Sequence, residues 1–201
     1  METKRVRVIG AGLAGSEAAL QLASFGFDVD LYEMRPEKPT PAHRGGALAQ
    51  LVCSNSFKGL ALTSAHGLLK NELNMLGSFL LKAAERTAVP AGESLTVNRD
   101  LFSEEVERLI LACPNITLHR EEVKTLEGEF PTIVAAGPLA SDTLADDIFK
   151  RLGSERLHFF DAIAPVVETE SIDFEHAFYK NRWEKGETED FINCPLDKET
   201  Y

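Results

Sequence analysis

The sequence lacks an apolar run long enough to cross a membrane. Its hydrophobic stretches all fall short of the roughly 20 residues that a membrane-spanning helix needs. Residues 1–10 already lead into a predicted strand, which leaves no room for a signal peptide. We therefore expect a cytoplasmic protein that has no membrane partner.

Cysteine is scarce as well. Only Cys53, Cys113 and Cys194 occur in the 201 residues. An odd number of cysteines at wide spacing fits reduced thiols better than a disulfide framework or a zinc site. We expect free thiols and no metal, with Cys113 and Cys194 in structural roles.

Positive charge is also in short supply. Lysine and arginine number 21 against 32 aspartate and glutamate residues, so the formal net charge is -11. This balance argues against general affinity for nucleic acids, which bind basic surfaces, but it does not exclude a local basic groove. Apolar residues make up 44% and charged residues 26% of the chain, as in ordinary globular proteins of one or two domains.

The first 33 residues have the pattern of a strand–helix–strand unit. Residues 4–9 and 28–33 alternate between apolar and polar side chains, which predicts two strands. Residues 14–26 place apolar side chains at helical spacing, and Gly26 ends the predicted helix. Because such units build parallel sheets, we expect an α/β fold.

A glycine motif joins the first predicted strand to the helix. Gly10 permits a tight turn, Gly12 lets the backbone approach a pyrophosphate, and Gly15 lets the helix pack closely on the strand. The start of the helix would present N–H groups and a positive dipole end to the phosphates. The candidate cofactor-binding residues of this motif are Gly10, Ala11, Gly12, Leu13, Ala14 and Gly15.

An acidic residue at the end of the second strand completes the nucleotide signature. Glu33 lies 18 residues after Gly15 and would accept hydrogen bonds from both ribose hydroxyls. The same charge would repel a 2′-phosphate, which disfavours NADP at this site. Arg35 is a candidate for contact with the adenine or the phosphates, and a solvated loop arginine is the alternative. Together these features predict a Rossmann-like fold.

FAD and NAD share this signature, and a later segment favours FAD. Residues 132–137, TIVAAG, resemble the second nucleotide motif of two-dinucleotide flavoproteins, in which a buried strand ends in a glycine beside the cofactor. Gly137 is that glycine. Val123, at the end of the strand predicted for residues 116–123, resembles the residue whose backbone meets the adenine.

The rest of the chain divides into predicted elements and two predicted domains. Helices are expected at 64–87, with Ser64 as N-cap, at 100–112 and at 141–152, with Ser141 as N-cap. We expect an FAD-binding domain at 1–153, with its sheet completed by residues beyond 201. Residues 154–201 would begin a more antiparallel, substrate-side domain. The alternative is a small complete protein with a frayed end.

Five segments carry a resemblance to a known family. They are YEMRP (32–36), LVCSNSFKG (51–59), LLKNELNMLGS (68–78), VNRDLF (97–102) and FFDAIAPVV (159–167). The chain resembles, from residue 6 to its end, the bacterial folate- and FAD-dependent tRNA (uracil-5-)-methyltransferases. Members of that family are longer than this chain.

The resemblance implies an activity and a set of ligands. The family methylates C5 of the T-loop uridine in tRNA, with methylenetetrahydrofolate as carbon donor, FAD as cofactor and NAD(P)H as reductant. Cys53 matches the family's cysteine near the flavin, and a second functional cysteine lies beyond residue 201. A thiolate that adds to C6 of uracil makes C5 nucleophilic, which gives Cys53 a candidate catalytic role.

Several alternatives stay open at this point. Cys53 follows Leu51 and Val52, and a free cysteine in such a setting is often a small buried hydrophobe. His43, Arg44 and Lys58 are candidates for contact with tRNA phosphate or folate, or are plain surface charges. Other functions are modification of the tRNA wobble uridine, cofactor binding without turnover, and an NAD-linked oxidoreductase. We expect the chain alone to be inactive.

Overall fold

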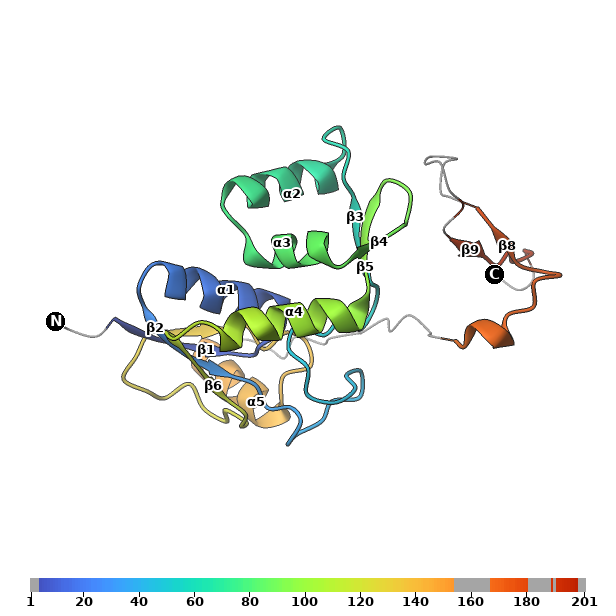
Figure 1. Ribbon diagram of the computed structural model, residues 1–201. Helices are drawn as coiled ribbons and strands as arrows, with labels where there is room; N and C mark the ends of the chain where they lie inside the picture. Colours follow the sequence, from blue (N-terminus) through green and yellow to red (C-terminus); the bar gives the residue numbers. More distant parts are fainter. Residues whose placement is uncertain (1–3, 154–166, 181–188, 190, 199–201) are drawn as a thin grey trace.

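The computed structural model describes residues 4–153, 167–180, 189 and 191–198 (Figure 1). A four-stranded parallel sheet, in the order β6-β2-β1-β7, forms its centre. The strands are β1 (Arg5–Ile9), β2 (Asp28–Tyr32), β6 (Ile116–His119) and β7 (Thr132–Val134). This arrangement confirms the predicted α/β class and the strand–helix–strand unit.

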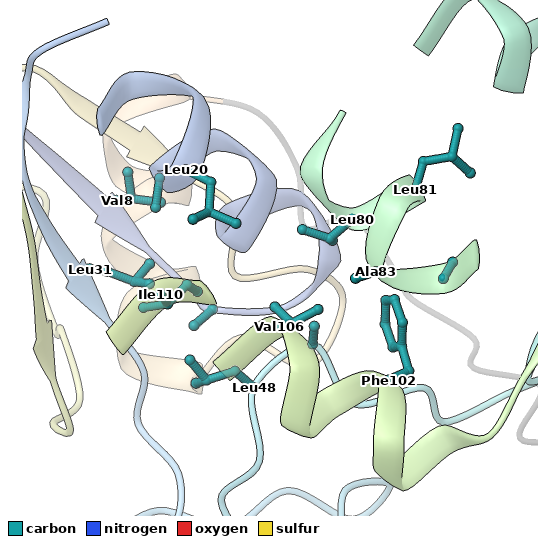
Figure 2. Close-up of a cluster of buried hydrophobic side chains, with 14 of the residues drawn as sticks. Val8, Leu20, Leu31, Leu48, Leu80, Leu81, Ala83, Phe102, Val106 and Ile110 are labelled. Carbon is teal, nitrogen blue, oxygen red and sulfur yellow. The ribbon is translucent and has the colours of Figure 1, made fainter. Parts of the chain in front are cut away.

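The helices α1 (Leu13–Ser24) and α4 (Arg99–Leu111) pack on one face of this sheet. Alternation along the strands gives that face its apolar side chains, including Val8, Val29 and Leu31, all at most 2% exposed. From α4, Phe102, Val106 and Ile110 recur every four residues and fill the space between the layers (Figure 2). This core fixes the start of α1 against the end of β1.

The opposite face of the sheet is polar. Arg5 on β1 forms an ion pair with the buried Asp30 on β2 at 2.5 Å, and His119 on β6 lies 2.9 Å from the same carboxylate. The Arg5 contact, with help from His119, outweighs burial and holds the pKa of Asp30 below its usual value. Parallel sheets usually carry apolar residues on both faces, so this sheet departs from the common pattern.

Between β2 and α4 the chain makes a long excursion. It contains β3 (Ser56–Gly59), α2 (Ala65–Met75), α3 (Phe79–Arg86), β4 (Ala88–Val89) and β5 (Ser94–Val97). The three strands pair antiparallel in the order β3-β5-β4. The sequence did not indicate this second sheet.

The single helix predicted for residues 64–87 is wrong. The chain turns at Gly77, whose φ of +81° favours glycine, and Ser78 begins α3 by capping the N–H of Leu81. The leucines on the two sides of this turn also differ in burial. Leu69 of α2 is 54% exposed, whereas Leu80 of α3 is buried.

Two predicted strands are shorter than expected. β6 ends at His119 instead of Val123, and β7 ends at Val134 instead of Gly137. β7 is an edge strand in the described part of the chain, and Ile133 and Val134 on it are 38% and 41% exposed. The prediction that it is buried is therefore wrong here.

The helix caps follow the sequence closely. Ser64 caps α2, and Ser141 caps α5 (Asp142–Leu152), which ends at Gly153 with φ +63°. Of the predicted second region, the structure describes a short 3-10 turn and the antiparallel pair β8 (Phe178–Tyr179) and β9 (Ile192–Asn193). The aromatic segment 159–166 lies outside the described residues, and the division at residue 153 stays a prediction.

Among the described residues, no helix combines the length and the apolar character that a membrane span requires.

Candidate nucleotide-binding cleft

A cleft of about 360 Å³ opens at the carboxyl ends of the parallel strands. Its walls include Ile9 and Gly10 at the end of β1, Tyr32 and Glu33 at the end of β2, and Ala135 after β7. β1 lies between β2 and β7, so the strand order reverses beside it. Ligands of open α/β sheets bind at such switch points.

The glycines of the first turn have different surroundings. A Cβ atom on Gly10 would lie 2.6 Å from the carbonyl oxygen of Ala135, and one on Gly15 would lie 1.7 Å from the carbonyl oxygen of Gly10. Gly12, by contrast, has nothing within 4 Å of that position. Packing therefore demands the outer two glycines, whereas Gly12 leaves open space beside the cleft.

The start of α1 faces this open space. Gly12 is the N-cap and offers no side-chain acceptor, so the first N–H groups of the helix are not capped by a side chain. Gly10, Gly12, Leu13 and Ala14 line the cleft. Ala11 is fully buried and does not line it. A helix start of this kind suits a phosphate group.

Glu33 is held by the motif that precedes it. Its carboxylate accepts hydrogen bonds from the N–H of Ala11 at 3.2 Å, the N–H of Arg35 at 3.1 Å and the Nε of Arg35 at 2.9 Å. Burial opposes its ionisation, but these contacts prevail and keep the pKa of Glu33 below its usual value. Glu33 is therefore an ionised, fixed acceptor in the cleft wall.

Arg35 is buried beside Glu33 and lines the same cleft. Its residue exposure is 3%, which rules out the solvated loop arginine considered above. In the described part of the chain, its Nη1 atom is buried and has no hydrogen-bond partner. A buried unpaired cationic donor is costly, so this atom suits an acceptor that a ligand brings.

Val123 and Gly137 are part of the wall of the same cleft. Both line the cleft, together with Glu122 and Ser141. Val123 follows β6 in an irregular segment, and Gly137 adopts φ +65° after β7. The structure thus brings these two residues to the cleft from loops, where the sequence predicted strand ends.

Cys53 also lines this cleft. It is exposed, which excludes its role as a small buried hydrophobe, and it shares the lining with Thr40, His43 and Gln50. Arg44, Lys58, Cys113 and Cys194 do not line the cleft. In the described residues, no group of three or more His, Cys, Asp or Glu side chains could hold a metal ion.

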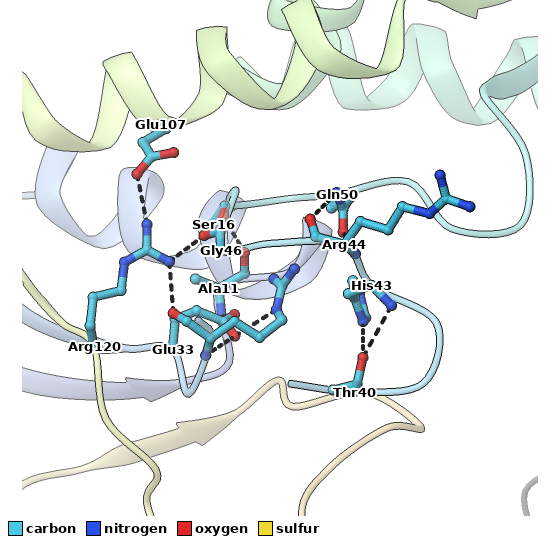
Figure 3. Close-up of polar contacts among 11 residues, drawn as sticks. Ala11, Ser16, Glu33, Thr40, His43, Arg44, Gly46, Gln50, Glu107 and Arg120 are labelled. Atoms are coloured by element: carbon cyan, nitrogen blue, oxygen red, sulfur yellow. Dashed lines mark hydrogen bonds and ion pairs between the residues drawn. The ribbon is translucent and has the colours of Figure 1, made fainter. Parts of the chain in front are cut away.

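Thr40, His43, Gln50 and Cys53 belong to one long loop between β2 and β3, which side-chain contacts hold in place (Figure 3). Thr40 Oγ1 lies 2.6 Å from Nδ1 of His43, and Gln50 exchanges two hydrogen bonds of 2.8 Å with the backbone of Arg44. No sequence pattern indicated these pairs or the contact that Arg120, just after β6, makes with the loop.

The fold and the cleft define a class. A parallel sheet with a glycine turn at its switch point and an acid after its second strand is a dinucleotide-binding α/β protein of the Rossmann type. The family model described as glucose inhibited division protein A matches residues 5–201, and the chain belongs to that family.

Similar proteins align with nearly the whole length of this chain. It is 51% identical to the methylenetetrahydrofolate–tRNA-(uracil-5-)-methyltransferase TrmFO of Lactobacillus helveticus (strain DPC 4571), over 98% of this chain and 48% of that protein. The protein of the same name from Aquifex aeolicus (strain VF5) is 52% identical, over 98% and 44%. The chain therefore spans about half the length of these relatives.

A solved structure shares the fold. Aquifex aeolicus GidA in its form II crystal superimposes with a TM-score of 0.50 and 21% identity, over 62% of this chain and 20% of that one. At this identity, the likeness concerns the fold alone.

Proposed function

We propose that this chain is the cofactor-binding part of an FAD-dependent tRNA (uracil-5-)-methyltransferase. The whole enzyme methylates C5 of the T-loop uridine, with methylenetetrahydrofolate as carbon donor and NAD(P)H as reductant. One observation carries the proposal, which is that the nucleotide elements Gly12 and Glu33 and an exposed thiol at Cys53 line a single cleft. The relatives that are about 50% identical to this chain are named methylenetetrahydrofolate–tRNA-(uracil-5-)-methyltransferase.

The residues of the cleft fit FAD. The Glu33 carboxylate would accept the ribose hydroxyls, and the unpaired Nη1 of Arg35 would donate to an acceptor of the same ligand. The open space at Gly12 and the start of α1 would receive the pyrophosphate. Val123 and Gly137 would line the adenine and flavin surroundings. When bound, the flavin supplies carbon transfer and reducing equivalents.

Cys53 is the chain's candidate for covalent chemistry. A thiolate is the reactive form of cysteine, and an exposed thiol on a cleft wall can reach a bound substrate. We assign Cys53 the role of a nucleophile or of a group that positions the reacting carbon near the flavin. Cys113 and Cys194, which lie outside the cleft lining, have no such role.

An absorption spectrum after gel filtration tests cofactor binding. We expect flavin absorption to co-elute with the chain, or with the longer protein if the chain alone binds too weakly. Gly12→Ala should lose the flavin while the protein stays folded, because the new methyl group enters the open space. A longer protein that elutes without flavin under the same conditions would contradict the proposal.

The position of the new methyl group separates this proposal from wobble-uridine modification. Nucleoside analysis of tRNA treated with the whole enzyme, folate donor and NAD(P)H should give 5-methyluridine in the T-loop. Cys53→Ala should abolish it, and Cys113→Ala should leave it. Modification at the wobble position would favour the other enzyme.

A further inference from the structure

One wall of the cleft consists of a loop without regular structure. Between β2 and β3, from Glu33 to Asn55, the chain forms no helix or strand, yet it carries Arg35 near one end and Cys53 near the other. Ordered loops of this length in compact domains are uncommon and are usually functional. Side-chain contacts are needed to hold the two ends of this loop in fixed positions relative to each other.

Arg120, at the end of β6, makes contacts of that kind (Figure 3). Its Nη1 donates to the carbonyl oxygen of Arg35 at 3.1 Å and to the carbonyl oxygen of Gly46, and its Nη2 donates to Glu107 of α4 at 2.7 Å. The guanidinium thus joins α4 to two separate parts of the loop. Its planar fork of donors allows it to serve several acceptors in fixed directions.

The two loop segments that Arg120 holds also touch each other. A Cβ atom on Gly46 would lie 2.8 Å from Cδ of Pro36, so the backbone at Gly46 packs directly against the residue after Arg35. A shift of one segment must therefore move the other. Arg120 itself does not line the cleft, so any effect it has on a ligand passes through the loop.

Other contacts secure the loop at single points. Lys38 pairs with Glu122 at 2.7 Å, and the N–H of Ala49 donates to the carbonyl oxygen of Ala11 at 2.9 Å. The Arg120 contacts differ because they connect the residue that carries the unpaired Nη1 to the segment that leads into Cys53. The charged partner on α4 anchors this connection to the protein core.

We propose that Arg120 is a positioning residue, which couples occupation of the nucleotide end of the cleft to the placement of the Cys53 segment. The inference rests on the proposed function for the identity of the ligand. The proposed clamp, which is the hold of Arg120 on Arg35, Gly46 and Glu107, rests on these three contacts alone. When the ligand fixes Arg35, Arg120 transmits that constraint to Gly46 and so to the loop that leads to Cys53.

The test compares Arg120→Met with Arg108→Met in the full chain. Arg108 is a matched control, because it pairs only with Glu105 on the exposed side of α4 among the contacts described. The first measurement is hydrogen–deuterium exchange of the ligand-free proteins. We expect Arg120→Met to raise exchange in the peptides around Arg35 and around residues 44–53 together, and Arg108→Met to raise neither.

The second measurement is peptide-resolved alkylation of Cys53 by N-ethylmaleimide, with and without saturating FAD. In the wild type, we expect FAD to slow alkylation by about tenfold, and in Arg120→Met by less than about threefold, because coupling between sites commonly amounts to 5–150-fold. A purely structural role would change FAD affinity but would leave the protection intact at saturation. Rates at Cys113 and Cys194 serve as internal references.

The outcomes are separable. Unchanged exchange in Arg120→Met, or unchanged protection of Cys53 at saturating FAD, would overturn the proposal. If the wild type binds no flavin but Arg120→Met still raises exchange in both peptides, the result would support the role of Arg120 in holding the loop and would count against the proposed function. If Arg120→Met does not fold, Arg120→Lys decides in its place, since an ammonium group cannot span the three acceptors. It should raise exchange in both peptides, and normal exchange there would overturn the proposal.

Discussion

The Nε atom of Arg35 donates a 2.9 Å hydrogen bond to Glu33, and the N–H of Arg35 donates to the same oxygen at 3.1 Å. Glu33, the acid proposed to bind the ribose, is therefore already paired within its own chain. The pairing fixes its geometry, while the buried Nη1 of Arg35, a residue that lines the cleft, has no hydrogen-bond partner among the described residues. We therefore propose that Glu33 and Arg35 together offer an acceptor and a donor to a nucleotide.

Removal of Glu33 should destabilise the protein strongly. Glu33→Ala leaves a buried arginine without its counter-charge, and we expect a loss of about 3 kcal/mol in the free energy of unfolding. The control is Glu105→Gln, which weakens two ion pairs to the exposed arginines Arg86 and Arg108 and should cost less than about 1 kcal/mol. Urea unfolding measures both. Equal losses in the two variants would contradict the buried pairing.

The lowered pKa of Glu33 predicts a dependence of stability on pH. A carboxyl group with a lowered folded-state pKa contributes stability that is complete above its usual value of 4.5 and is lost as pH falls through the folded-state pKa. Asp30 and Glu105, the latter with a pKa of about 2, act in the same direction. The acid-induced loss in wild type should therefore exceed that in Glu33→Gln, as measured by urea unfolding between neutral pH and pH 3. Parallel profiles would count against the assignment.

The glycine motif predicts two different outcomes for the same substitution. Gly15→Ala should unfold or strongly destabilise the protein, because its Cβ would lie 1.7 Å from a backbone oxygen. Gly12→Ala should keep its melting temperature, because Gly12 has φ -73° and open space around it, yet it should weaken FAD binding. Thermal unfolding and flavin titration separate the two. Normal flavin affinity in Gly12→Ala would place the pyrophosphate elsewhere.

The parts that the sequence predicted well depend on local patterns. The strand–helix–strand unit, its glycine turn and the caps at Ser64 and Ser141 all arise from residues a few positions apart. Such local patterns predict structure well because they determine the conformation of the neighbouring backbone. The cleft residues Gly10, Gly12, Leu13, Ala14 and Glu33 could be named for the same reason.

The parts that the sequence missed depend on tertiary contacts. Leucines continue at helical spacing through residues 68–81, so periodicity alone could not reveal the turn at Gly77. Strand pairing among β3, β5 and β4 joins distant segments and leaves no local pattern. Arg120 donates a hydrogen bond to Gly46, which lies 74 positions earlier in the sequence, and no sequence motif predicts a contact of that kind. Long-range side-chain contacts therefore account for most of what was missed in the site.

Glu17 on α1 joins this helix to α3, which lies in the segment between β2 and α4. Its carboxylate accepts hydrogen bonds from the N–H of Leu80 at 2.8 Å, the N–H of Phe79 at 3.1 Å and the hydroxyl of Ser78 at 3.0 Å. It thus acts as a cap for α3 from another helix, where a negative charge also suits the helix dipole.

Glu17→Ala should lower the free energy of unfolding by about 2 kcal/mol, the upper range for loss of a helix cap. Glu17→Gln should cost about half as much, since the amide keeps one acceptor but loses the charge. The control is Glu104→Ala on the exposed side of α4, which should change stability by less than about 0.5 kcal/mol. In hydrogen exchange, the loss should concentrate in residues 78–86. A Glu17→Ala protein with wild-type exchange in α3 would show that the helix begins without this carboxylate.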